Sequence, residues 1–312
     1  MKFQPDILLA HGSSALKYGA VSRLFYRKGL AVYRNIGLAS FWARGRLRVW
    51  ANRLCLRAFD ATVSLSSRTR EDFVHLYRVP PSKVWAIPNG VDPTPFERVR
   101  DASVRQGYRR CLGIEEDQVA LISVGKLSPE KDQGQLLEVV ARARGQGIPA
   151  KLLLVGEGPL KEEIQGGIAR MGLEGQALML GLRDDVPSLM AAADLFLLSS
   201  KTESMPAVLI EAGLAGLASV AYNVGAVADV VKDGRTGILV PQGQLGLFVQ
   251  AALSLMKDAR RRHALGAAAR EHCQEHFDLR KVASMYGALF LRLLASKNGV
   301  KGGQTEESAL AH

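Results

Sequence analysis

With 312 residues and 47% apolar side chains, the chain is long enough to build two domains with separate cores. Its three cysteines, an odd number with no close pairing, argue against a disulfide framework or a cysteine zinc site. The apolar run at the N-terminus, residues 7–10, is too short for the core of a signal peptide, and no run approaches the 20 residues of a membrane-spanning helix. The net charge of +11 is concentrated in residues 1–95, where 15 Lys and Arg stand against 5 Asp and Glu, so this third should attract an anionic membrane surface or nucleic acid.

Short runs rich in Val, Leu and Ile alternate with longer stretches of helical pattern, which is typical of parallel sheets built from βαβ units. Four strands are predicted before position 90, at residues 7–10, 31–34, 61–65 and 84–87. Six more are predicted after it, at residues 119–124, 151–155, 177–180, 195–198, 218–221 and 237–240. The predicted fold class is therefore α/β.

The stretch from Arg44 to Phe59 has five arginines and no acid, and it predicts a basic amphipathic helix. Three of the arginines share one face and four apolar residues share the next: Arg46, Arg53 and Arg57, then Leu47, Ala51, Leu54 and Ala58. Either the apolar side packs on the sheet, or the helix from Arg44 to Arg57 faces an anionic membrane surface. Nucleic acid is not expected as a partner, because this region lacks interleaved aromatics and any recognisable binding module.

The segment 88–95, Pro-Asn-Gly-Val-Asp-Pro-Thr-Pro, is dense in turn residues, and its prolines argue against a central strand. A hairpin turn is the alternative, but an interdomain linker is favoured. We therefore predict a partial N-terminal domain over residues 1–92 and a second domain over 93–278. A C-terminal helix over 279–296 and a disordered tail over 297–312 should follow.

Residues 195–212 predict a buried strand, a tight turn and then a helix, with Pro206 suited to the first helical turn. In a parallel sheet, ligands bind beyond the carboxyl ends of the strands, which places Glu203 at such a site. The N–H groups of Ser204 and Met205 and the positive helix end should favour an anionic ligand there. Glu211 follows eight residues after Glu203 and could hold hydroxyl groups beside it, although a capping Glu203 and a solvated Glu211 would give the same spacing.

A second strand-end loop, residues 123–131, carries Gly125 and two lysines, Lys126 and Lys131, which could clamp a diphosphate. Taken singly, these lysines would be plain surface charge. Two further glycine turns follow strands, at residues 156–159 and 225–226, so several independent loops converge on one edge of the predicted sheet.

Together these segments resemble the family 4 retaining glycosyltransferases of GT-B fold, which have two Rossmann-like domains facing each other across a cleft. The likeness runs from about Asp6 to Leu293. The matching segments are residues 86–92 (Ala-Ile-Pro-Asn-Gly-Val-Asp), Val124-Gly125-Lys126-Leu127 with Lys131, Leu154-Val155-Gly156-Glu157-Gly158-Pro159, Gly181 with Asp185-Val186, and Glu203 to Glu211 as the family's E-x7-E. Each segment is weak by itself, but the set is specific.

The resemblance also implies a role for each site residue, and it marks Glu203, Lys126, Lys131 and His11 as candidate catalytic residues. Lys126 and Lys131 would hold the donor diphosphate, and Glu203 would hold the hydroxyls of the transferred sugar. Glu211 would bind the ribose of the donor. The further donor-binding residues would be Gly125, Gly156, Leu182, Arg183, Ser204, Met205 and Pro206, with the loop around Leu182 and Arg183 flanking the base.

The implied activity is transfer of a sugar from a UDP- or GDP-type donor to an acceptor hydroxyl, with retention, in glycan, polysaccharide or glycolipid synthesis. No metal or other cofactor is expected, because no Asp-x-Asp motif occurs and the lysines with a helix N-terminus can neutralise the leaving diphosphate. A glycan or lipid-linked acceptor is expected as partner. The expected location is the cytoplasm or the inner face of the membrane.

The N-terminal domain departs from the family pattern, because residues 5–12 resemble a strand and loop that usually lie well inside it. Its predicted sheet is therefore incomplete, and the open edge could pair with a partner protein. Asn35 stands where relatives often carry a catalytic histidine, which leaves His11 as the one histidine on a strand-end loop of this domain. These departures keep open the alternative of a non-catalytic nucleotide-sugar-binding subunit or a truncated inactive paralogue.

Overall fold

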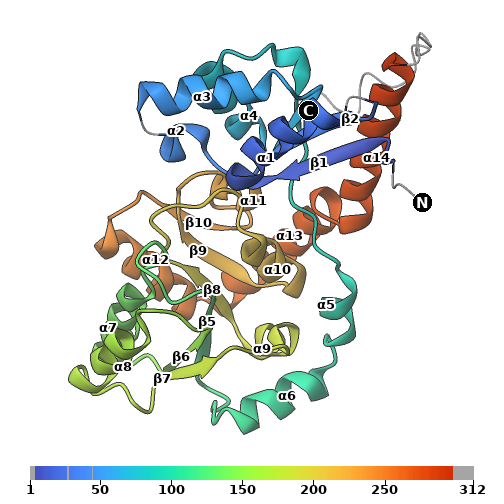
Figure 1. Cartoon of the computed structure of the whole chain (residues 1–312). Coiled ribbons are helices and arrows are strands. Elements are labelled where there is room, and N and C mark those ends of the chain that lie inside the picture. The colour runs from blue at the N-terminus through green and yellow to red at the C-terminus, as the bar shows by residue number, and fades with distance from the viewer. Residues whose placement is uncertain (1–3, 27, 44, 298–312) are drawn as a thin grey trace. The chain divides into compact units, whose positions relative to one another are not determined.

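The computed structural model describes residues 4–26, 28–43 and 45–297, and these form two compact units (Figure 1). The first unit extends to Gly90 and also includes the C-terminal helix from Leu279, whereas the second is Val91–Asp278. The C-terminal helix, predicted as a separate element, thus belongs with the N-terminal sheet. The tail predicted beyond residue 297 lies outside the described residues.

The N-terminal unit contains a parallel sheet with the strand order β1-β2-β3-β4. These strands are β1 (Ile7–His11), β2 (Leu30–Asn35), β3 (Ala61–Ser64) and β4 (Val84–Ala86). The α-helices of the unit are α1 (Gly12–Phe25), α2 (Ala39–Trp42), α3 (Arg46–Leu56), α4 (Ser67–Tyr77) and α14 (Leu279–Lys297), and a short 3₁₀ helix covers Pro81–Lys83. In register, Leu9 pairs with Val32, and Val32 pairs with Ala61.

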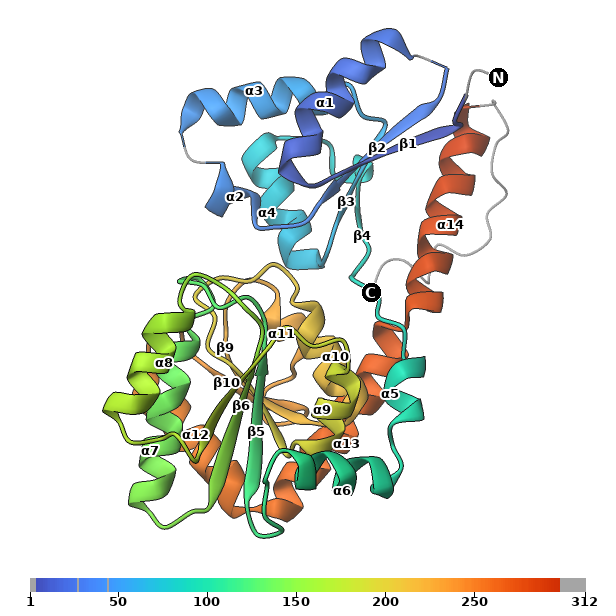
Figure 2. The ribbon, with the colours of Figure 1, turned by 60° about the horizontal axis from the view of Figure 1, so that its bottom comes forward.

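Alternate residues of these strands enter two different cores, because side chains point to opposite faces along a strand. On one face, α1, α3 and α4 bury a cluster that includes Leu16, Tyr33, Leu56 and Phe73. On the other face, α14 covers strand residues such as Val32 and Val63 with its own Val282 and Leu289. The unit is therefore a three-layer arrangement with the sheet in the middle (Figure 2).

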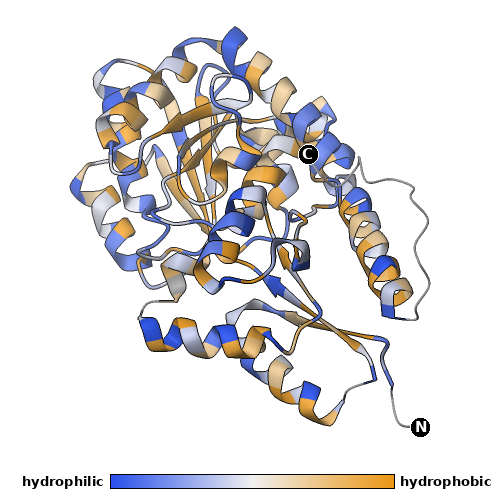
Figure 3. Ribbon diagram, turned by 90° about the horizontal axis from the view of Figure 1, so that it is seen from above, coloured by the Kyte–Doolittle hydropathy of each residue, from blue (hydrophilic) through white to orange (hydrophobic). Residues whose placement is uncertain are grey.

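The C-terminal unit contains a six-stranded parallel sheet with the order β10-β9-β8-β5-β6-β7. Its strands are β5 (Val119–Val124), β6 (Ala150–Val155), β7 (Ala177–Gly181), β8 (Leu195–Leu198), β9 (Ala218–Tyr222) and β10 (Gly237–Val240). Its α-helices are α5 (Thr94–Arg98), α6 (Ala102–Cys111), α7 (Leu136–Gly145), α8 (Lys161–Arg170), α9 (Val186–Ala192), α10 (Ala207–Ala215), α11 (Val227–Val230), α12 (Leu245–Lys257) and α13 (Ala259–His276), and Gln133–Gln135 is 3₁₀. The inner strands are buried along their whole length, and Figure 3 shows them as hydrophobic ribbon between amphipathic helices.

All ten predicted strands are present, each with ends within one residue of the prediction, so the α/β fold class is confirmed. The chain passes between the two units twice, at Gly90–Val91 and at Asp278–Leu279. These two passages are joined, since Val91 N–H donates to Phe277 O at 2.9 Å and Val91 forms a parallel bridge with Asp278. A Cβ on Gly90 would come within 2.9 Å of Leu279 Cα, which explains a glycine at this point.

Helix α3 forms where the basic amphipathic helix was predicted, but its buried side differs from the predicted apolar stripe. Leu47 and Leu54 are 79% and 51% exposed, whereas Leu56 is buried and Val49 packs against the same core. The prediction that the stripe through Leu47 and Leu54 packs on the sheet is therefore wrong. The neighbouring stripe through Val49 and Leu56 faces the core instead. Arg44 lies outside the described residues.

No helix in the described part of the chain combines the length and apolar character needed to cross a bilayer.

Candidate donor site

The strand order of the C-terminal unit reverses between β5 and β8. From β5 the chain adds β6 and then β7 on one side, and from β8 it adds β9 and β10 on the other. The loops after two such neighbouring strands leave the sheet in opposite directions and open a crevice at its carboxyl edge. The loop after β5 carries Lys126 and Lys131, and the loop after β8 carries Glu203, so both predicted loops flank this point.

An ion pair joins the two loops, because Lys131 Nζ lies 2.5 Å from Glu203 Oε1. The Glu203 side chain is 8% exposed and that of Lys131 is 25% exposed, so the carboxylate is the more deeply buried partner. Such a pair is stable only when the remaining hydrogen-bond sites of both groups are also used. The geometry leaves two N–H bonds of the ammonium for other acceptors, such as an anionic ligand.

Lys131 is held in place through its backbone. Ser199 Oγ, directly after β8, donates to Lys131 O and Asp132 O, each at 3.0 Å. Asp132 adopts the left-handed conformation, with φ +51°, and its carboxylate pairs with Lys201 at 2.8 Å. Neither Ser199 nor Asp132 was singled out from the sequence. Their signal was weak, since a serine after a strand and an aspartate in a loop are both ordinary.

Lys126 lies on the same loop and is exposed. Its carbonyl oxygen accepts from Gln133 Nε2 at 2.9 Å, which fixes the backbone but leaves the side chain free to reach outward. Both lysines act on Glu130: its pKa is lowered by its own backbone N–H and by Ser128, and further by the charges of Lys126 and Lys131. The two ammonium groups therefore both lie close enough to Glu130 to stabilise its negative charge.

Three glycines allow the backbones of neighbouring loops to touch. A Cβ on Gly156 would lie 2.0 Å from Gly125 O, and a Cβ on Gly158 would lie 2.2 Å from Leu127 O. On the other side of the strand-order reversal, a Cβ on Gly225 would lie 1.6 Å from Glu203 O. These contacts require glycine, and they show that the loops after β5, β6, β8 and β9 meet at one edge of the sheet.

Helix α10 begins at Ala207, four residues after Glu203. Pro206, predicted to lie in the first helical turn, is instead the N-cap of this helix, because its ψ of 113° is extended. Ser204 O accepts from Ala226 N at 2.8 Å, so the turn before the helix is held by the Gly225–Ala226 turn. Met205 is 4% exposed. The helix N-terminus thus adds a partial positive charge beside the lysine loop.

Glu211 occupies the second turn of α10 and is partly buried, and this burial raises the pKa of its carboxyl group. No hydrogen bond of its carboxylate to another described residue is found. The carboxylate oxygens are not among the fully buried side-chain atoms that lack a partner, so they are not sealed from solvent. Hydroxyl groups of a ligand would be suitable partners, since they donate to a carboxylate.

The residues predicted to flank the base lie on the loop after β7. Leu182 is 79% exposed. Arg183 donates to Asp185 with two hydrogen bonds of 2.8 and 2.6 Å, and Asp185 also accepts from Tyr108 Oη at 2.9 Å. Gly156 N–H donates to Gly181 O, which ties this loop to the one after β6. Arg183 is therefore oriented by its neighbours, while Leu182 presents an apolar surface to solvent.

The two candidates of the N-terminal unit lie at the ends of neighbouring strands. His11 ends β1, and its Nδ1 lies 3.3 Å from Arg34 Nη1. Burial, and then the charge of Arg34, lower the pKa of His11, so the neutral imidazole is favoured. Asn35 is buried at the end of β2 and donates through Nδ2 to Gly37 O at 2.8 Å.

This architecture is the GT-B fold of glycosyltransferases, as solved structures show. HepE of Anabaena, crystallised in complex with UDP, superposes with a TM-score of 0.84 at 23% identity, covering 92% of this chain and 79% of that one. Residues 104–272 match the family described as Glycosyl transferases group 1, and residues 1–94 match Glycosyltransferase Family 4. The chain therefore belongs to the glycosyl transferases group 1 family, and the predicted family resemblance is confirmed.

Similar curated proteins include two synthases. N-acetyl-alpha-D-glucosaminyl L-malate synthase of Bacillus anthracis is 31% identical over 71% of this chain and 57% of its own length. Alpha-maltose-1-phosphate synthase of Mycolicibacterium smegmatis is 28% identical over 79% of this chain and 66% of its own length. The chain thus spans less than two thirds of the length of these relatives.

Proposed function

We propose that this protein is a retaining glycosyltransferase that moves a sugar from a UDP- or GDP-type donor to an acceptor hydroxyl. The observation that carries the proposal is the Lys131–Glu203 pair, which joins the two loops at the reversal point of the sheet. A cation and a carboxylate held together can bind the two ends of a sugar diphosphate, because the diphosphate is anionic and the sugar carries hydroxyl donors. Family membership supports the same conclusion.

In the proposed reaction the bond between the anomeric carbon and the diphosphate oxygen breaks. The electron pair leaves with the diphosphate, and the acceptor oxygen forms a bond to the anomeric carbon on the same face. The acceptor proton passes to the departing oxygen. Negative charge therefore grows on the diphosphate, where Lys126, Lys131 and the N-terminus of α10 stabilise it.

The remaining residues bind the donor. Glu203 would accept from hydroxyls of the sugar while it keeps its bond to Lys131, and Glu211 would accept from the ribose. Leu182 and Arg183 would flank the base. His11 or Asn35 would serve at the anomeric centre, as the family resemblance implies, and β1 as an edge strand would suit pairing with a partner protein. The acceptor is proposed to be a glycan or a lipid-linked molecule.

Calorimetry and product analysis with UDP and GDP sugars test this proposal. A catalytic protein binds one class of donor, releases the nucleoside diphosphate and forms a product whose anomeric configuration, read by NMR, matches that of the donor. Binding without release of diphosphate would instead identify a non-catalytic nucleotide-sugar-binding subunit. An inverted product would contradict retention while leaving the donor site intact.

Removal of divalent metals should leave activity unchanged, because the charge on the leaving diphosphate is met by two lysines and a helix N-terminus. The measurement is the initial rate of diphosphate release before and after EDTA treatment. Loss of rate that Mn²⁺ restores would contradict this charge argument.

Glu211→Gln should make the free protein more stable and the donor bind more weakly. The pKa of Glu211 is raised above its ordinary value by burial, so the folded state holds a proton more tightly than the unfolded state. Stability from this group is present at low pH and is lost as the pH rises through the folded-state pKa. The difference in melting temperature between variant and wild type should therefore grow from acidic to neutral pH.

The matching binding measurement is calorimetry with the nucleoside diphosphate at neutral pH. The amide keeps the shape of the carboxyl but is a weaker acceptor for ribose hydroxyls than a carboxylate. A variant that melts at the same temperature as wild type at every pH would show that burial does not destabilise the charged form of Glu211. Unchanged affinity would remove its proposed role in ribose binding.

A further inference from the structure

A surface of the N-terminal unit combines exposed large apolar side chains with a surplus of positive charge. From Ile7 to Phe59 the sequence contains ten Lys and Arg and not one Asp or Glu. Helices α1 and α3 both lie in this stretch and pack beside each other on the same face of the sheet (Figures 1 and 2). Their outer sides therefore face away from the core that their inner sides build.

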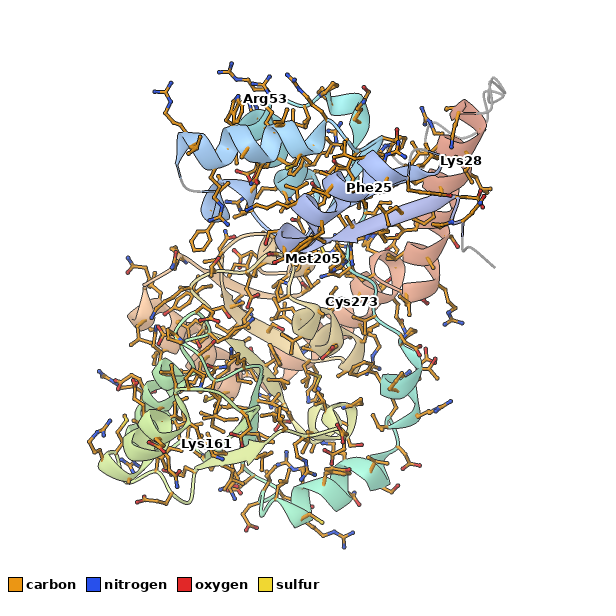
Figure 4. All side chains as sticks on the ribbon, viewed as in Figure 1. Phe25, Lys28, Arg53, Lys161, Met205 and Cys273 are labelled. Carbon is orange, nitrogen blue, oxygen red and sulfur yellow. The ribbon has the colours of Figure 1, made fainter. Side chains whose placement is uncertain are left out.

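The outer side of α1 is apolar to an unusual degree. Tyr18, Val21, Leu24 and Phe25 are all exposed, and Phe25 is 86% exposed. Lys17 on the same helix is also exposed, and Figure 4 labels Phe25, the last residue of α1, and Lys28, which is exposed and lies close to α14. Single apolar side chains on a surface are ordinary, but a grouped set of this size indicates a contact with another apolar phase.

Helix α3 repeats the same composition. Leu47, Trp50 and Leu54 are exposed at 79%, 62% and 51%, and they follow one another at the i, i+3, i+7 spacing of one helix face. Arg46, Arg48 and Arg57 are exposed around this stripe. Tryptophan beside arginine suits the boundary between headgroups and acyl chains, because each has an apolar body and a polar end.

A hollow lined by cationic side chains lies at the C-terminal end of α3. It is lined by Arg53, Arg57, Arg78 and Lys83, together with the apolar side chains of Leu56, Tyr77 and Val79 and Pro80. A second hollow next to it is lined by Trp50, Arg53, Leu54 and Arg57, so the apolar stripe and the cations share a border. Among the described residues, no carboxylate pairs with these four cations.

Two acids near this surface take part in contacts of the fold. Asp60 accepts from Arg23 and from Ala31 N–H, and Asp72 accepts from Ser40 N–H. The stretch from Ile7 to Phe59 has no acid of its own to balance its ten cations. Anionic phosphates outside the protein are the complement that it lacks.

We propose that the outer sides of α1 and α3 dock the protein on a bilayer that contains anionic phospholipids, with headgroup phosphates in the hollow of Arg53, Arg57, Arg78 and Lys83. The apolar residues of both helices enter the headgroup boundary, and the cations bind the phosphates around them. The docking surface shares no residue with the donor loops. The membrane proposal can therefore fail while the proposed transfer reaction holds, and the reverse.

Co-sedimentation of the full chain with vesicles tests the proposal. Vesicles of phosphatidylcholine with phosphatidylglycerol should bind the protein, and vesicles of phosphatidylcholine alone should not. Arg53→Glu with Arg57→Glu should lower the partition coefficient by at least about tenfold, since each basic residue close to an anionic surface adds to binding. Arg260→Glu with Arg261→Glu on α13 changes the same charge at exposed positions of the other unit and should leave binding nearly unchanged.

A second pair of variants tests the apolar contribution. Leu47→Asp removes an exposed leucine of α3, whereas the control Leu291→Asp removes one of α14 that is 70% exposed. Because neither side chain is in a core, both variants should fold, which melting curves check. Leu47→Asp should weaken vesicle binding by about tenfold, and Leu291→Asp should not.

Two results would overturn the proposal. One is equal binding of wild type to neutral and anionic vesicles, or no binding to either. The other is binding of duplex DNA, but not of anionic vesicles, that Arg53→Glu with Arg57→Glu abolishes, which would assign the surface to nucleic acid.

Discussion

Lys131→Ala is expected to lower turnover by about 10²- to 10³-fold, the usual effect of removing one preorganised donor from developing charge. The effect should appear in kcat, because the charge on the diphosphate increases as the bond to the sugar breaks. The variant should also melt at a lower temperature. Glu203, at 8% exposure, would be left as a buried carboxylate without its 2.5 Å partner.

The double variant Lys131→Ala with Glu203→Gln separates the two effects. It removes the unpaired charge, so the melting temperature should recover while turnover stays low. Lys201→Ala is a control for the loss of a lysine from an ion pair. Lys201 pairs with Asp132 at 2.8 Å on the same side of the sheet, but it is 52% exposed, and exposed pairs contribute little to stability. Lys126→Ala should reduce kcat like Lys131→Ala but leave stability unchanged. A change below about threefold in both lysine variants would refute their assignment to the diphosphate.

Gly225→Ala is expected to reduce turnover by about 10²-fold, because displacement of a catalytic group by about 1 Å has that order of effect. The new Cβ would stand 1.6 Å from Glu203 O, so the backbone of Glu203 has to move. The φ of +55° at this residue adds backbone strain for any side chain. Initial rates and melting temperatures of the purified variant measure both effects.

Gly234→Ala is the control for strain alone. Its φ of +70° is similar, but no atom lies within 4 Å of the added Cβ. It should lose stability through its backbone conformation and keep its turnover. If Gly225→Ala and Gly234→Ala lose activity equally, the contact between the two loops is not what positions Glu203.

The strands were predictable because each is a short apolar run that ends at turn residues. Val119–Val124 and Leu195–Leu198 lie in the middle of a parallel sheet, where both faces are covered, so no alternation interrupts the run. The buried side of α3 was not predictable. The sequence favours the stripe through Leu47, Ala51 and Leu54, whereas the tertiary structure buries Val49 and Leu56.

The candidate site was predictable as a set of loops, because Lys126, Lys131 and Glu203 all follow strands. Which loops face each other depends on the order of the strands in the sheet. No local sequence pattern predicts that this order reverses between β5 and β8. The support from Ser199 and the left-handed Asp132 depends on that juxtaposition too. The fit of Gly156 against Gly125 is likewise a property of the assembled sheet.

The return of α14 to the first sheet has a consequence for synthesis. A ribosome releases the strands of the N-terminal unit first, yet the helix that seals Val32 and Val63 emerges only after the whole second unit. During that interval one side of the nascent sheet lacks its cover, and such surfaces are prone to misassembly. Of these two units, the one translated earlier is thus completed later.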